Sequence, residues 1–96
     1  MVTHLVLFRL KSDAPATAAQ EMIDRLRSMA GKIPTLQAME AGINGYASER
    51  SYDVALITRF ASWEDLDAYR THPVHRDVVS FITQYVEKSR VVDFEG

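Results

Sequence analysis

The residues most capable of chemistry lie together in the segment Tyr69-Arg70-Thr71-His72-Pro73-Val74-His75. Proline disfavours helical geometry at the preceding residue but is well accepted in the first turn of a helix, so Pro73 predicts a helix break at His72 and a new helical segment after it. His75 then lies in that first turn, where the positive end of the helix dipole disfavours a protonated imidazole. We expect His75 to be neutral near pH 7 and able to act as a general base.

Two further side chains could share a site with His75. Tyr69 lies on the turn before the break, and its hydroxyl could point into the same cavity and polarise a carbonyl. His4 shares a face of the first predicted strand with Val6 and Phe8, and a polar group in such an apolar setting needs a hydrogen-bond partner or a ligand. The candidate catalytic pair is therefore Tyr69 and His75. The candidate ligand-binding residues are His4, Val6, Phe8 and His72.

Each of these side chains also has an ordinary structural role open to it. Tyr69 could pack its ring on the sheet and bond a carbonyl, and His75 could hold the helix break through backbone hydrogen bonds. His4 could be a core histidine whose hydrogen bonds are satisfied. His72 and His75 have a spacing that metal ligands can have, but no third ligand accompanies them, so neither a metal nor a cofactor is expected.

The elements that must position these residues can be read from apolar periodicity. Strands are predicted at 3–10, 36–42 (a weaker candidate), 52–60 and 90–94, where β-branched and large apolar residues gather. Helical spacing predicts a first helix at 17–30, with Ser12 or Asp13 as its cap, and a second helix that Ser62 caps. Pro73 divides the second helix, and the apolar stripe of the later piece runs to Tyr85.

This order, β-α-β-β-α-β, is typical of the ferredoxin-like α+β sandwich. Such a fold has a four-stranded antiparallel sheet with both helices on one face. With 96 residues, the whole chain is expected to form one domain, 1–96.

The strands are apolar on both faces, which predicts a homodimer. In the first strand, Leu5 and Leu7 lie opposite the face that carries His4, Val6 and Phe8. Helices on one face cannot cover both, and an antiparallel sheet that faced water would carry a polar outer row. We expect a second copy to cover the exposed face, with a cavity between the two sheets. A monomer with an apolar ligand groove is the alternative.

Composition excludes several classes of protein. The net charge is −2 and the basic residues are scattered, which argues against nucleic-acid binding. There is no cysteine, so disulfides and thiolate chemistry are ruled out. No apolar run approaches the ~20 residues of a membrane span, and no signal peptide is recognisable, so a cytoplasmic location is expected.

Four segments together resemble the stress-responsive A/B-barrel family. They are Thr3-His4-Leu5-Val6-Leu7-Phe8-Arg9-Leu10, Ser51-Tyr52-Asp53-Val54-Ala55-Leu56, the Tyr69–His75 segment, and Val91-Val92-Asp93-Phe94. The resemblance covers nearly the whole chain and implies a dimeric α+β barrel. It also implies that Tyr69 and His75 match the acid and base of a plant branch similar to olivetolic acid cyclase, which closes polyketides by aldol condensation.

Three functions are consistent with these observations. The first is a small binding or stress-associated protein that holds a hydrophobic or aromatic molecule in an apolar cavity. The second is a polyketide cyclase-like enzyme in which His75 is the base and Tyr69 the acid. The third, by analogy with other dimeric α+β barrels, is a cofactor-free monooxygenase.

Overall fold

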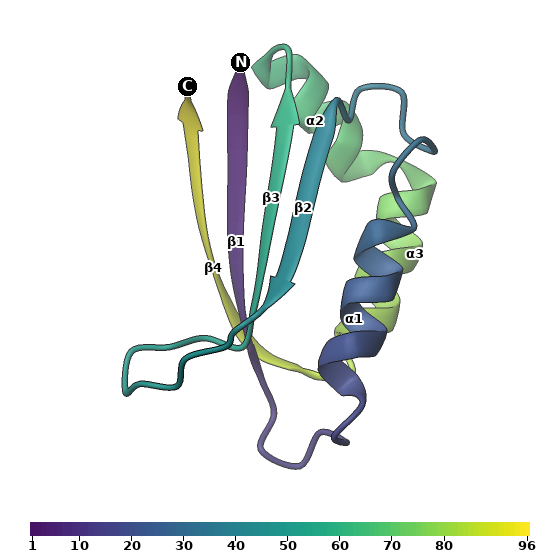
Figure 1. Ribbon diagram of the computed structural model, residues 1–96. Helices are drawn as coiled ribbons and strands as arrows, with labels where there is room; N and C mark the ends of the chain where they lie inside the picture. The colour runs from purple at the N-terminus through teal and green to yellow at the C-terminus, as the bar shows by residue number, and fades with distance from the viewer.

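The computed structural model describes all residues, 1–96. Its elements are β1 (Val2–Leu10), α1 (Ala18–Arg27), β2 (Ala38–Ile43), β3 (Val54–Phe60), α2 (Trp63–Thr71), α3 (Pro73–Ile82) and β4 (Val86–Glu95) (Figure 1). None of the helices has the length and apolar character needed to cross a membrane.

The sheet is four-stranded in the order β2-β3-β1-β4, and every neighbouring pair is antiparallel. β1 is central and pairs along its length with both β3 and β4. This register places His4 between Thr58 on β3 and Asp93 on β4. The predicted ferredoxin-like arrangement is confirmed.

The break at Pro73 forms as predicted. Ser62 caps α2, because its hydroxyl accepts a hydrogen bond from the Asp65 amide. α2 ends at Thr71, His72 has extended backbone geometry with φ −67° and ψ 138°, and Pro73 is the first residue of α3. The break therefore joins two rigid helical pieces through a single extended residue.

Other boundaries differ from the sequence prediction. α1 begins after Thr17, and neither Ser12 nor Asp13 caps it; it ends at Arg27, before the turn in which Gly31 takes a φ of 78°. The last helix stops at Ile82. The final strand begins at Val86, earlier than predicted, because β4 pairs with β1 back to Leu10 across a register shift near Arg9. Long-range pairing with β1 outweighs the local helical periodicity that reaches Tyr85.

The helices α1 and α3 lie on the same face of the sheet (Figure 1). The face of β1 that carries Val6 and Phe8 points toward them and joins a core with α1, α3 and β3. This face therefore does not line the cavity that was expected between two sheets. Because α1 and α3 cover it, any cavity beside His4, Val6 and Phe8 lies within one chain.

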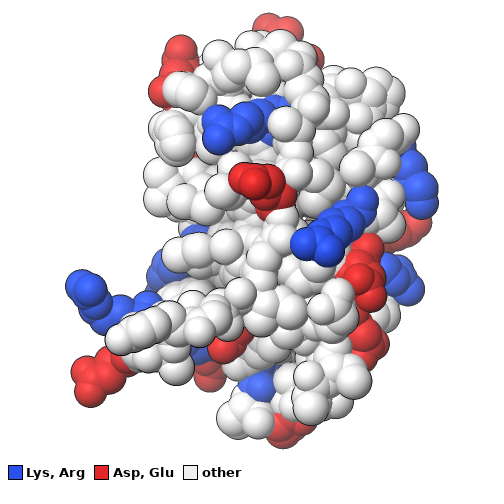
Figure 2. All heavy atoms as spheres, viewed as in Figure 1, with Lys and Arg blue, Asp and Glu red and all other residues white.

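The opposite face of the sheet is bare and apolar at its centre. Leu5 lies directly between Ile57 and Val92 in the register of the strands, and Leu7 and Phe94 share that face. Leu7 is 36%, Phe94 43% and Val92 57% exposed. The segment that joins β2 to β3, residues 44–53, projects beyond the sheet on this helix-free side (Figure 1). Figure 2 shows it as an arm, and the charged residues on the visible face are scattered without a field of one sign.

Candidate functional site

A cavity of about 240 Å³ lies between the sheet and the helices, and its wall is mainly apolar. β1 contributes Val6 and Phe8, which were proposed from the sequence as ligand-binding residues, and the remaining apolar side chains come mostly from α1 and α3. The complete lining is His4, Val6, Phe8, Leu26, Met29, Leu56, Tyr69, His75, Val78, Val79, Ile82, Thr83, Val86 and Ser89.

The three predicted chemical side chains meet at one end of this cavity. Tyr69 comes from the end of α2, His75 from the first turn of α3 and His4 from β1. The ring centroids of Tyr69 and His75 are 4.5 Å apart, and those of His4 and Tyr69 are 6.2 Å apart. The helix break brings Tyr69 and His75 together, because it lets two helical pieces point their side chains at a common space.

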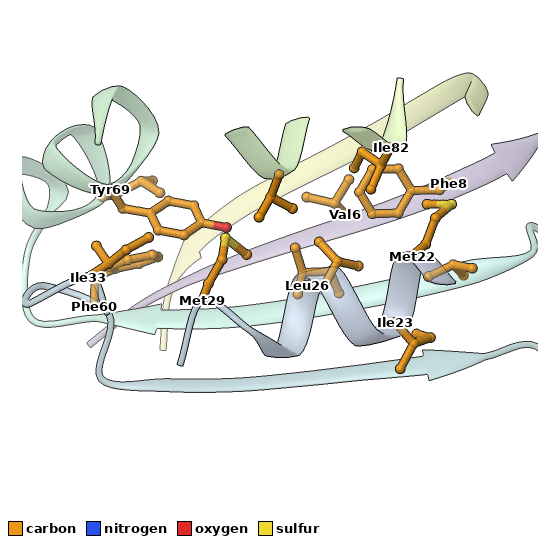
Figure 3. Packing of buried hydrophobic residues seen from close by; sticks show 14 of the residues in the cluster. Val6, Phe8, Met22, Ile23, Leu26, Met29, Ile33, Phe60, Tyr69 and Ile82 are labelled. Carbon is orange, nitrogen blue, oxygen red and sulfur yellow. The ribbon is translucent and has the colours of Figure 1, made fainter. Parts of the chain in front are cut away.

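Tyr69 is a core residue whose hydroxyl reaches the cavity. Its side chain is 1% exposed, and its ring packs on Phe60 with centroids 5.0 Å apart. Figure 3 shows the hydroxyl directed inward toward Met29. The hydroxyl forms no hydrogen bond within the chain and still has surface open to the cavity. Burial raises the pKa of Tyr69 to about 12, so the hydroxyl is protonated and can donate a hydrogen bond.

His75 is held in one orientation by the backbone. Its Nδ1 lies 3.0 Å from the carbonyl oxygen of Arg70. A carbonyl can only accept, so Nδ1 carries the proton and Nε2 is the free acceptor of the neutral ring. Burial is the largest cause that lowers the pKa of His75, the hydrogen bond to the Arg70 carbonyl raises it, and the electrostatic effects of His4 and Arg70 lower it further. The predicted neutral imidazole is supported, although burial is the main reason and not the helix dipole.

His4 forms a pair with Asp93 across β1 and β4. Its Nδ1 contacts the Asp93 carboxylate, and the ring is buried. An ionised carboxylate can only accept a hydrogen bond, so Nδ1 of His4 carries the proton that it donates to Asp93. The other ring nitrogen, Nε2, takes no part in this contact. His4 thus has the hydrogen-bond partner that its apolar setting requires. This partner is itself a titratable group.

His72 does not line the cavity. Its Nδ1 accepts a hydrogen bond from the Val74 amide at 3.1 Å, so the ring caps the start of α3. The structure therefore gives His72 a capping role outside the cavity, and its part in ligand binding stays a prediction. A histidine directly before a helix-opening proline is in position to cap, and this was the signal for the structural role.

Sequence reasoning assigned no role to Asp93. Its signal was a single carboxylate within the apolar strand Val91-Val92-Asp93-Phe94, but only the β1–β4 register shows that it faces His4. The lining residues Leu26 on α1, Met29 just after α1 and Val78 on α3 were not predicted either, because helical periodicity identifies the buried side of a helix without showing where a cavity remains. No group of three or more His, Asp or Glu side chains is arranged to hold a metal ion.

Comparison with known proteins agrees with this fold. The family model described as "Stress responsive A/B Barrel Domain" matches residues 2–96 of the sequence. A stress-response A/B barrel domain-containing protein of Arabidopsis thaliana is 33% identical over 79 residues, which are 82% of this chain and 30% of the plant protein. This chain therefore spans about a third of that relative.

Solved structures show the same architecture. A dimeric protein of ferredoxin-like fold from Bacteroides fragilis has a TM-score of 0.85 at 26% identity, covering 99% of this chain and 95% of the other. Hydroxynitrile lyase from Passiflora edulis has a TM-score of 0.83 at 18% identity, covering 97% and 90%. Given the family match over residues 2–96 and this shared fold, the chain belongs to the stress-responsive A/B barrel domain family.

Proposed function

We propose that this chain forms a homodimer in which each subunit binds a small, mainly apolar carbonyl compound in the cavity beneath α1 and α3. The observation that carries the proposal is the composition of the cavity: an apolar chamber with three hydrogen-bonding side chains gathered at one end. Small-molecule sites commonly have this form, since apolar walls supply affinity and a few polar groups set orientation. A volume of about 240 Å³ suits a ligand of modest size.

The homodimer is proposed from the bare face of the sheet. Leu7, Val92 and Phe94 are each more than a third exposed at its centre, and the arm at 44–53 extends along the same side. A second sheet packed there would bury this surface, as permanent dimers do over roughly 2,000 Å². The Bacteroides fragilis relative is described as dimeric, which supports this arrangement. Since the cavity lies on the other face, each subunit would carry a complete site.

Binding can be tested with the probe 4-butylacetophenone, an apolar ketone, by isothermal titration calorimetry. The Val78→Phe variant places a ring in the cavity and should abolish binding, because Val78 lines the wall. Ala68→Phe adds the same ring on the exposed side of α2 and is the matched control. Equal binding by the wild-type chain and a folded Val78→Phe variant would place the ligand elsewhere.

A second function, acid–base catalysis, is favoured by the meeting of Tyr69 and His75. The free Nε2 of neutral His75 can take a proton from the carbon next to a bound carbonyl. The protonated Tyr69 hydroxyl, which has no partner in the chain, can donate to the enolate oxygen that forms. Attack of that carbanion on a second carbonyl forms a carbon–carbon bond. The resulting alkoxide takes the proton back from His75, which completes an aldol cyclisation.

The chemical step can be followed without knowing the natural substrate. In D2O, enolisation replaces the methyl hydrogens of 4-butylacetophenone by deuterium, and proton NMR records the loss of signal. The wild-type chain should exceed the buffer rate. His75→Asn should return to the buffer rate, and Tyr69→Phe should lose about a hundredfold of the wild-type rate. The control His72→Ala should exchange at the wild-type rate, since His72 lies outside the cavity. If the wild-type chain binds the ketone but exchange proceeds only at the buffer rate, the catalytic function is rejected and the binding function stands.

A further inference from the structure

Outside the cavity, a shallow groove of about 380 Å³ runs beside the α2–α3 break. Arg70, His75, Arg76, Val79 and Ser80 line it. His75 and Val79, one turn apart on α3, line both this groove and the cavity. The two spaces are therefore neighbours that share a rim, and a molecule held at His75 can extend from one into the other.

Two cationic side chains of this groove have no partner in the chain. The only close contact between groups able to form an ion pair is that of His4 with Asp93, so neither Arg70 nor Arg76 is neutralised. Neither guanidinium donates a hydrogen bond to another residue, although Arg9, Arg27, Arg59 and Arg90 all do. Both side chains are exposed, so their donors are available to a ligand.

The charge of Arg70 acts on the site itself. It is among the causes that lower the pKa of His75, as expected for a cation close to the ring. Val79 is 40% exposed and continues the apolar wall of the cavity into the groove. An apolar rim flanked by two free guanidinium groups suits a molecule with an apolar body and an anionic end.

We propose that the ligand of this chain carries an anionic head group, held by Arg70 and Arg76 in the groove, while its apolar body enters the cavity past His75. This inference rests on the proposed function and narrows it to amphiphilic acids. Guanidinium groups bind carboxylate and phosphate oxygens in a bidentate manner, so both heads share the required chemistry. A free carboxylic acid and a phosphorylated carrier or ester are the two sources to be distinguished.

The experiment compares matched probes by isothermal titration calorimetry at low salt. 4-Butylbenzoate and 4-butylbenzamide have the same body and differ in charge, and 4-butylphenyl phosphate offers the other anionic head. The protein variants are Arg70→Gln, Arg76→Gln and the double variant. Lys11→Gln, which removes an exposed charge outside both the groove and the cavity, is the control. Because all these positions are exposed, we expect folded proteins, and circular dichroism verifies this.

The benzoate or the phosphate should bind the wild-type chain about tenfold more tightly than the amide, a difference of about 1.4 kcal/mol. The double variant should lose this preference and Lys11→Gln should keep it; whichever anion is preferred identifies the head group. Equal binding of acid, phosphate and amide to the wild-type chain would overturn the groove proposal and leave the cavity proposal standing. A preference that survives in the double variant would overturn it as well. If none of the three probes bound at millimolar concentration while 4-butylacetophenone did, only the groove proposal would be rejected; if the ketone also failed to bind, both proposals would be rejected.

Discussion

Replacing Tyr69 by Phe separates a structural tyrosine from a functional one. The ring of Tyr69 is almost fully buried and packs on Phe60, and Phe keeps these contacts. Only the hydroxyl is removed, and the hydroxyl has no hydrogen bond to lose. Burying an unpaired polar group costs about 1–3 kcal/mol, and access to the cavity reduces this cost. The free energy of unfolding should therefore stay the same or rise by up to about 1 kcal/mol.

For a domain of this size, 1 kcal/mol corresponds to a shift of about 4–8 °C in Tm. Tyr69→Phe should thus melt at the wild-type temperature or several degrees higher, measured by calorimetry at one fixed chain concentration because a dimer's Tm depends on concentration. Tyr69→Ala removes the ring as well and should lose about 3–5 kcal/mol. In the α-proton exchange assay, loss of the hydroxyl donor should cost about a hundredfold in rate.

A clear destabilisation would refute this reasoning. If Tyr69→Phe lost more than about 1 kcal/mol, the hydroxyl would have a structural hydrogen bond in the folded chain. Tyr69 would then be a packing residue with a satisfied polar end, and its part in the proposed chemistry would be lost. Unchanged exchange in a folded Tyr69→Phe variant would reject the donor role alone.

Three further predictions concern other parts of the molecule. The pKa of His75 is lowered from 6.5, so NMR titration of its ring should give a midpoint below that value. The neutral base form, and with it the rate of α-proton exchange, should be constant above pH 7 and fall as the pH drops below 6.5. A midpoint above 7 would contradict the neutral base. Leu7→Lys puts a charge on the bare sheet face and should halve the mass measured by sedimentation equilibrium or prevent folding. The control Ala68→Lys, on the helix side, should remain a dimer. A Leu7→Lys variant that stays dimeric would place the interface elsewhere. His72→Ala removes the cap of α3 and should cost about 1 kcal/mol in urea denaturation while leaving ketone affinity unchanged; a loss of affinity would return His72 to the site.

The sequence predicts the fold of this protein well because its local signals are strong. The segments 3–10 and 52–60 are rich in β-branched and large apolar residues, and a proline follows a helical stretch; each of these signals is consistent with few structures. The end of the last helix was predicted too late, since Tyr85 continues the helical period. The pairing of β4 with β1 ends that period, and pairing between distant segments leaves no local mark.

The candidate site was predicted only in part. Tyr69 and His75 lie close in sequence, and a helix break is enough to bring them together. His4 and Asp93 are 89 positions apart, so their contact depends on the strand register. The position of the cavity could not be predicted, because both faces of β1 are apolar and the sequence of this strand does not show which face the helices cover.

The bond between His4 and Asp93 also has a consequence for the biosynthesis of the protein. It joins the first and last strands of the domain, so a nascent chain still lacking β4 has β1 with one edge unpaired and His4 without its carboxylate. Contacts between distant segments form slowly, and an open strand edge can pair with other chains. The pair of His4 and Asp93 can therefore form only after β4 has left the ribosome, and deletions that remove Asp93 should leave the buried ring of His4 without its carboxylate partner.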